Sequence, residues 1–135
     1  IKTTQLLPNV LAKTYANEKN AYEGIFIDHE GYVTEGSSSN IWIINKNNEI
    51  LTREIDGKIL SGITRKTISQ FAKINNFKML EKKFTKDEMI KSKEVFLTSA
   101  SSFVTPIIEI DNIKINNGMI GKTSIELRNL YFKNF

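Results

Sequence analysis

The chain has 135 residues, with 19 Lys or Arg, 15 Asp or Glu, a single His and no Cys. This length suits one domain, and a hydrophobic fraction of 40% is too high for a disordered chain. Without cysteine, disulfide scaffolds, thiolate metal sites and cysteine nucleophiles are excluded. The basic residues are scattered and only three are Arg, and no apolar run approaches the roughly 20 residues of a membrane-spanning helix, so neither nucleic acid nor a membrane is an expected partner.

The first predicted elements are a helix and a hairpin. Residues 7–20 are expected to be helical, because Pro8 suits the first helical turn and apolar residues follow at helical spacing. Two short apolar runs, at 22–27 and 32–35, flank a polar turn at 28–31, which favours a β-hairpin.

The middle of the chain predicts a buried strand and a longer helix. Residues 40–44 are apolar on both faces and indicate a buried strand, and the polar turn at 46–49 returns the chain into a strand at 50–52. A loop with two glycines then opens a predicted helix at 63–75. The expected core side of that helix comprises Ile68, Phe71, Ala72 and Ile74.

The last third of the chain predicts further strands and two helices. Thr85 and Glu88 have the spacing of a capping box and therefore indicate the start of a short helix. The other elements are strands at 78–83, 94–99 and 104–110, a short segment at 114–115 after a turn at 111–112, and a final helix that follows Gly121 and ends at about 132. Strands and helices alternate irregularly, so the expected fold class is a mixed α/β (α+β) domain.

Two loops hold residues suited to binding a ligand. The start of the helix near Gly62 would form an anion site from its outward N–H groups, with a hydroxyl from Thr64; a plain capped helix start is the alternative. Glu35 ends a predicted strand beside Gly36, where its carboxylate either accepts a charge-assisted hydrogen bond or is exposed in a turn. His29 is expected to be an exposed turn residue, and a single histidine excludes a histidine metal cluster.

Four segments of the chain together carry a family pattern. They are KTTQLLPNVLAK (2–13), YE with VTEGSSSN (22–23 and 33–40), LSGITR (60–65) and TSASSFVTP (98–106). In this order and spacing they resemble the class IV (fold-type IV) pyridoxal-phosphate aminotransferases, most closely the D-amino acid type. The resemblance implies a pseudo-barrel of strands flanked by helices, pyridoxal 5'-phosphate as cofactor, and transfer of an amino group from a D-amino acid such as D-alanine to a 2-oxo acid.

The resemblance also implies roles by position. Lys2 matches the lysine that forms the internal aldimine with the cofactor and then moves a proton on the way to a pyridoxamine intermediate, so Lys2 is the expected catalytic residue. Glu35 matches the carboxylate that bonds the pyridine nitrogen. The other expected cofactor-binding residues are Ser38 and Ser39 below the ring, Leu60 on its face, and Gly62, Ile63, Thr64, Ser99, Ala100 and Ser101 at the phosphate.

The chain departs from the family pattern in places. Ala100 stands where many members carry a phosphate-binding threonine, so Ser99 or Ser101 would have to compensate, and Phe103 replaces an acidic residue of several relatives. Because the chain starts one residue before Lys2, we expect residues 1–135 to be the C-terminal cofactor-binding domain of a longer cytoplasmic, homodimeric enzyme that lacks its small N-terminal domain here. A branched-chain L-amino acid aminotransferase, an aminodeoxychorismate lyase and an inactive cofactor-binding fragment are the alternatives.

Overall fold

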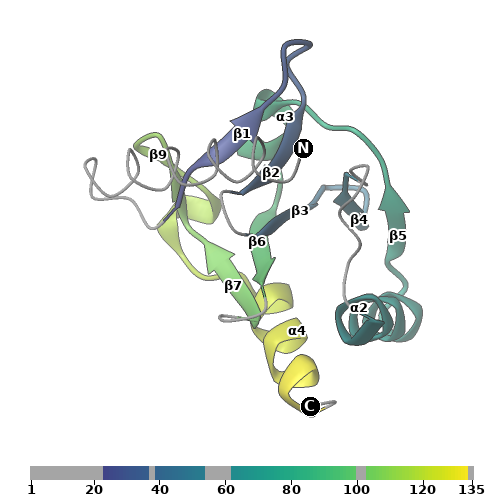
Figure 1. Cartoon of the computed structure of the whole chain (residues 1–135). Helices are drawn as coiled ribbons and strands as arrows, with labels where there is room; N and C mark the ends of the chain where they lie inside the picture. Colours follow the sequence, from purple (N-terminus) through teal and green to yellow (C-terminus); the bar gives the residue numbers. More distant parts are fainter. Residues whose placement is uncertain (1–22, 37–38, 54–61, 100–102, 134–135) are drawn as a thin grey trace.

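The strands gather into one main sheet and two small hairpins (Figure 1). The computed structural model describes residues 23–36, 39–53, 62–99 and 103–133. The main sheet has the order β5-β4-β3-β6-β7, and the hairpins are β1-β2 and β8-β9. The strands are β1 (Ile25–Ile27), β2 (Val33–Gly36), β3 (Asn40–Ile44), β4 (Glu49–Thr52), β5 (Lys78–Glu81), β6 (Glu94–Ser99), β7 (Phe103–Ile107), β8 (Glu109–Ile110) and β9 (Ile113–Lys114). The helices of these described ranges are α2 (Gly62–Ile74), α3 (Lys86–Ile90), the 3-10 helix η1 (Asn116–Gly118) and α4 (Lys122–Lys133), which confirms the mixed α/β class.

The central strand β3 and its neighbour β6 have apolar residues on both faces. β3 pairs antiparallel with β4 on one side and with β6 on the other. Residues 41–44 of β3 are all buried, and so is every residue of β6 except the last. Trp42 and Phe96 face each other from these two strands with their rings stacked 5.8 Å apart, so Trp42 is a core residue. The predicted bounds of both strands are confirmed.

The segment from β4 through α2 to β5 is a crossover unit. β4 and β5 are parallel neighbours, so α2 returns the chain from the carboxyl end of β4 to the start of β5. The first turn of α2 therefore lies at the side of the sheet where β4 and β6 end and β3 begins. This row of strand ends is called the edge of the main sheet below. Ile68, Phe71 and Ala72 are buried as predicted, whereas Ile74 is 73% exposed. That prediction was wrong because Ile74 lies about 120° around the helix from Ile68.

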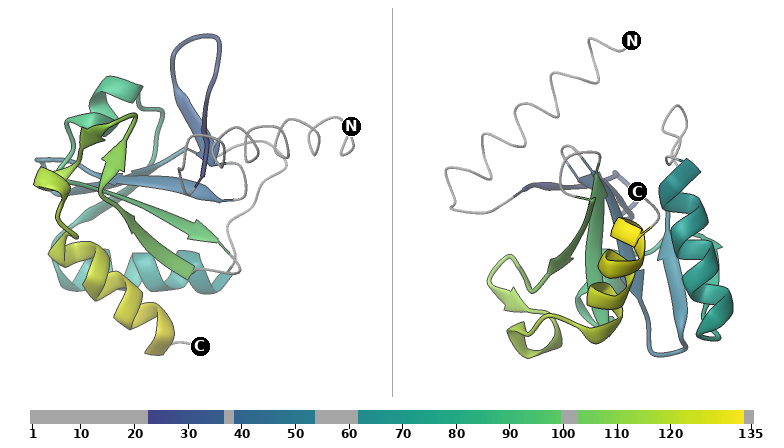
Figure 2. Two further views of the ribbon diagram at one scale, coloured as in Figure 1. Left: turned by 90° about the vertical axis from the view of Figure 1, so that its left-hand side faces the viewer. Right: turned by 90° about the horizontal axis from the view of Figure 1, so that it is seen from below.

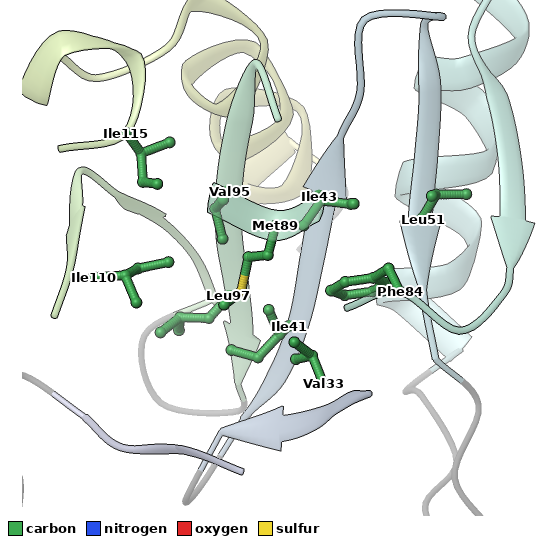
Figure 3. Packing of buried hydrophobic residues seen from close by; sticks show 10 residues of the cluster. All are labelled: Val33, Ile41, Ile43, Leu51, Phe84, Met89, Val95, Leu97, Ile110 and Ile115. Atoms are coloured by element: carbon green, nitrogen blue, oxygen red, sulfur yellow. The ribbon is translucent and has the colours of Figure 1, made fainter. Parts of the chain in front are cut away.

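The two faces of the main sheet carry separate apolar clusters. Figure 2 shows α2 and α4 together on one side of the strands and the β1-β2 hairpin on the other. The cluster beneath the two helices comprises Trp42, Ile44, Ile50, Ile68, Phe71, Ala72, Phe96, Val104, Leu127 and Tyr131. The cluster on the opposite face comprises Val33, Ile41, Ile43, Leu51, Phe84, Met89, Val95, Leu97, Ile110 and Ile115 (Figure 3). Coverage on both faces explains why β3 and β6 have apolar residues at consecutive positions, 41–44 and 95–97.

The strand predicted at 104–110 is in fact two strands. β7 ends at Ile107, and β8 turns back into β9 through Asp111 and Asn112. These two residues have positive φ angles of 50° and 65°, as a two-residue hairpin turn requires. Within the described sheet β7 pairs only with β6, so it is an edge strand and tolerates Pro106.

The shorter predicted elements are confirmed with small shifts in their bounds. β1 and β2 form an antiparallel hairpin, and His29 in its turn is exposed. Thr85 and Glu88 make both bonds of the capping box at α3, although β5 ends at Glu81 rather than at 83. The final helix follows Gly121 as expected. The helix predicted at 7–20 lies outside the described residues, and no helix within them is long and apolar enough to cross a membrane.

Candidate active site

Glu35 lies at the end of β2, where that strand packs against β3. Because side chains alternate along a strand, Glu35 lies on the same side of β2 as the fully buried Val33. The residue is half-buried, and its Oε2 atom is shielded from solvent. The alternative of an exposed acid in a turn therefore does not hold, and the position suits a carboxylate that serves a partly buried cation.

The turn after Glu35 is held by Glu23, a residue for which the sequence analysis predicted no role. The Ser39 hydroxyl donates a hydrogen bond to the Glu23 carboxylate, and the Gly36 N–H donates to the Ser39 carbonyl at 2.9 Å. A Cβ atom on Gly36 would overlap both Glu23 Oε2 and Ser39 Oγ, so a larger residue there would have to displace these two side chains. Ser39 is buried, and its hydroxyl oxygen can still accept a hydrogen bond. Glu23 belongs to the quoted family pattern, and that was the only available signal.

The start of α2 presents Ile63 outward and Thr64 inward. Ile63 is 41% exposed, Thr64 is only 6% exposed, and Gly62 is the first helical residue. The first turn contains no acidic residue, so the positive end of the helix dipole meets no local negative charge from its own helix. The Thr64 and Tyr131 hydroxyl oxygens lie 3.4 Å apart, which ties this turn to α4. These features are compatible with the predicted anion site, and the residue that would cap the helix, Ser61, lies outside the described residues.

The end of β6 lies beside the same aromatic residue of α4. Ser99 is the last residue of β6 and pairs with Phe103, the first residue of β7. The Phe103 ring packs against the Tyr131 ring with centroids 5.5 Å apart. On the neighbouring residue, the Thr98 hydroxyl accepts a hydrogen bond of 3.0 Å from the Trp42 indole. Ser99 and Thr64 are therefore connected through Phe103 and Tyr131, a link between residues far apart in the sequence that no local pattern could indicate.

The predicted residues converge on one edge of the main sheet. Ser39 leads directly into β3, whose first residue Asn40 pairs with Thr98, next to Ser99. The first turn of α2 lies at this edge by topology, and Glu35 is joined to it by the turn that Ser39 completes. A phosphorylated pyridine needs one partner for its protonated ring nitrogen and another for its dianionic phosphate. The shielded carboxylate suits the ring nitrogen, and the helix start without acidic residues suits the phosphate.

Part of the predicted site lies outside the described residues. The positions concerned are Lys2, Ser38, Leu60, Ala100 and Ser101. The described edge therefore comprises the expected carboxylate, the expected start of α2, and the ends of β6 and β7 on either side of residues 100–102.

Three comparisons identify the family. Residues 1–110 match the family described as Amino-transferase class IV. A D-alanine aminotransferase of Staphylococcus aureus (strain N315) is 44% identical over 129 residues, which cover 95% of this chain and 45% of that protein. A branched-chain-amino-acid aminotransferase of Pseudomonas aeruginosa is 42% identical over 124 residues, which cover 92% of this chain and 40% of that protein.

Comparison of the fold with solved structures indicates the same family. The crystal structure of the branched-chain aminotransferase from the thermophilic archaeon Thermoproteus uzoniensis with norvaline matches with a TM-score of 0.81 and 30% identity, covering 95% of this chain and 42% of that chain. The chain thus spans less than half the length of these relatives. Since the family pattern extends over 110 of its 135 residues and the fold agrees, the chain belongs to the class IV aminotransferase family.

Proposed function

We propose that residues 1–135 are the cofactor-binding domain of an aminotransferase that uses pyridoxal 5'-phosphate to move an amino group between a D-amino acid, such as D-alanine, and a 2-oxo acid. The observation that carries this proposal is the shielded carboxylate of Glu35, held at the sheet edge where α2 begins. Family membership and the curated D-alanine aminotransferases at 42–44% identity support it.

The residues of this chain have distinct tasks in the proposal. When bound, the cofactor supplies a ring that withdraws electrons from the substrate. Glu35 holds the proton on the ring nitrogen, because an ionised carboxylate stabilises a neighbouring cation. The Lys2 amine anchors the cofactor and moves the proton at the substrate Cα, provided that its surroundings keep it partly unprotonated.

The remaining residues orient the cofactor. The Ile63 and Thr64 N–H groups and the Thr64 hydroxyl bind phosphate at the start of α2, where the helix dipole favours an anion. The other proposed contacts are Ser38, Ser39, Leu60, Gly62, Ser99, Ala100 and Ser101. We further propose that the complete enzyme is a cytoplasmic homodimer whose other parts bind the substrate carboxylate.

A branched-chain L-amino acid aminotransferase is the second candidate. It is favoured by the Pseudomonas aeruginosa relative at 42% identity and by the fold match to a branched-chain enzyme. Both candidates use the same lysine and glutamate, so the described edge does not separate them. The D-amino acid donor is preferred because LLPNVLAK (6–13) and EGSSSN (35–40) resemble the D-amino acid type.

Half-reactions with single donors test the proposal. The complete protein, loaded with pyridoxal 5'-phosphate, is mixed separately with D-alanine, L-alanine, L-leucine and aminodeoxychorismate, and the visible absorption of the lysine-bound cofactor is followed. We expect D-alanine to bleach the band and L-alanine, the matched control, to leave it unchanged. Bleaching by L-leucine alone would establish the branched-chain alternative, and no bleaching by any donor would contradict aminotransferase activity.

A further inference from the structure

Tyr131 of α4 touches both sides of the candidate active site. It lies in the last helix, beyond residues 1–110 that match the family, and is only 5% exposed. Its hydroxyl oxygen lies 3.4 Å from that of Thr64, in the first turn of α2. Its ring packs against Phe103, the first residue of β7, with the ring centroids 5.5 Å apart.

The ring of Tyr131 is held in place by its aromatic neighbours. Phe103 has a φ angle of 59°, a left-handed conformation that a bulky residue adopts only when its surroundings hold it there. Phe103 packs edge-on against Phe132 at 5.1 Å, and Arg128 lies 5.0 Å from the centre of the Phe132 ring. Arg128 also donates a 2.6 Å hydrogen bond to the Val104 carbonyl, which fixes α4 against β7. Because the ring cannot shift easily, its hydroxyl has a defined position relative to Thr64.

The pairing of two hydroxyls determines what Thr64 can offer to an anion. A hydroxyl has one proton and two lone pairs, so either partner can donate. In the structure the Thr64 hydroxyl is the donor, 3.4 Å from the Tyr131 oxygen. When a phosphate binds, the two hydroxyls can exchange roles: Tyr131 then donates to Thr64, and the Thr64 proton turns toward a phosphate oxygen. Tyr131 thus orients the hydroxyl of a group that is itself placed at the positive end of α2.

We propose that Tyr131 is a positioning residue for phosphate recognition, acting through the Thr64 hydroxyl. This inference rests on the proposed function of the site. It predicts that α4 influences the affinity for the phosphate group of the cofactor and not the affinity for its ring, because Tyr131 contacts Thr64 and Phe103, which lie next to the residues predicted at the phosphate.

The test uses Tyr131→Phe in the complete protein, which removes the hydroxyl and keeps the ring packed on Phe103. Apoprotein is titrated with pyridoxal 5'-phosphate and, separately, with pyridoxal, which lacks the phosphate, and binding is read from the cofactor absorbance. We expect the affinity for pyridoxal 5'-phosphate to fall about fivefold, the size of one neutral hydrogen bond, and the affinity for pyridoxal to stay constant. The ratio of the two affinities is insensitive to any unfolded fraction, because both ligands report on folded protein.

Two controls sharpen the result. Tyr32→Phe removes a hydroxyl outside the site, where the Lys83 ammonium lies 5.3 Å from the Tyr32 ring centre, and should leave the ratio unchanged. Thr64→Val removes the hydroxyl through which Tyr131 acts, so adding Tyr131→Phe to that variant should cost nothing more.

The outcomes separate this inference from the proposed function. An unchanged affinity ratio in Tyr131→Phe, or a full fivefold loss that persists in the Thr64→Val background, would overturn the positioning role while the proposed function stands. If the wild-type protein binds neither pyridoxal 5'-phosphate nor pyridoxal, the proposed function and this inference fail together.

Discussion

The Ser39 hydroxyl donates a hydrogen bond to the Glu23 carboxylate across the turn that follows Glu35. This bond connects the start of β1 to the start of β3, and the Gly36 N–H to Ser39 carbonyl bond closes the same turn. The carboxylate proposed to meet the cofactor nitrogen is therefore followed by a turn whose geometry depends on a second, distant carboxylate. The first three predictions concern Gly36 in this turn, the Glu35 carboxylate before it, and Asp28 in the β1-β2 hairpin.

Gly36→Ala should destabilise the fold. The added Cβ would overlap the Glu23 carboxylate and the Ser39 hydroxyl, and overpacking of this kind costs about 1–3 kcal/mol. The measurement is the free energy of unfolding from urea denaturation of the complete protein. Repeating Gly36→Ala in a Glu23→Ala background should give a smaller loss, because one of the two obstacles is then absent. An equal loss in both backgrounds would show that Glu23 does not occupy that space.

Glu35→Gln should retain the cofactor and slow transamination. A neutral amide cannot stabilise the protonated ring nitrogen as a carboxylate does, and a hydrogen bond to a charged group contributes about 1.5–3 kcal/mol, so the rate of the half-reaction should fall about 10- to 100-fold. Stopped-flow absorbance gives this rate, and the cofactor content is measured on the same sample. Glu30→Gln, which changes an exposed residue of the β1-β2 turn, is the matched control. A rate equal to that of the control would exclude the proposed role of Glu35.

The Asp28 carboxyl should titrate abnormally low because of Arg53. The Arg53 guanidinium, 2.5 Å from Asp28 Oδ2, and the Tyr32 backbone N–H lower the pKa of Asp28 from an ordinary 3.8 to about 2. A depressed folded-state pKa stabilises the fold above the unfolded pKa, so this contribution is present above about pH 4 and is lost as the pH falls toward 2.

Arg53→Ala tests that assignment directly. In this variant the pKa of Asp28, followed by NMR of its carboxyl carbon, should rise from about 2 toward 3.8, because the largest cause of the shift is removed. Arg65→Ala is the control, since Arg65 pairs with Glu81 instead. A pKa that stays near 2 in Arg53→Ala would mean that the backbone N–H groups alone hold it down.

Glu94→Gln should weaken the attachment of α4. The Glu94 carboxylate is 9% exposed and accepts hydrogen bonds from the Thr123 N–H at 3.2 Å and from both the N–H and the hydroxyl of Ser124 at 2.8 Å. An amide replaces one accepting oxygen by a donor, which leaves a buried N–H unsatisfied and costs about 1–3 kcal/mol. Urea denaturation measures the loss, and Glu109→Gln, at an exposed position of β8, should be neutral. Equal stabilities of the two variants would contradict this capping role.

The elements that follow from local pattern were predictable from the sequence. β3 and β6 have their predicted bounds because consecutive apolar residues, 41–44 and 95–97, are typical of a strand covered on both faces. Thr85 and Glu88 make the predicted capping box because both partners lie within one turn. Glu35 could be matched to the family because its block is contiguous, and the structure adds that the carboxylate is shielded at one oxygen.

Contacts between distant segments were not predictable. The break between β7 and β8 depends on the hairpin that β8 makes with β9, and the apolar run through it carries no such signal. Glu23 and Ser39 are separated by 16 positions, and Thr64 and Tyr131 by 67, so no spacing rule connects them. Ile74 is a different case, because its exposure follows from its position about 120° around α2 from the buried Ile68.

The central claim, that Lys2 anchors the cofactor in this domain, is tested most directly by the visible absorption spectrum of the complete protein with pyridoxal 5'-phosphate. Lys2→Ala is compared with Lys46→Ala, which changes an exposed lysine in the turn between β3 and β4. The account predicts that the band of the lysine-bound cofactor disappears in Lys2→Ala and persists in Lys46→Ala. An unchanged band in Lys2→Ala would contradict the account.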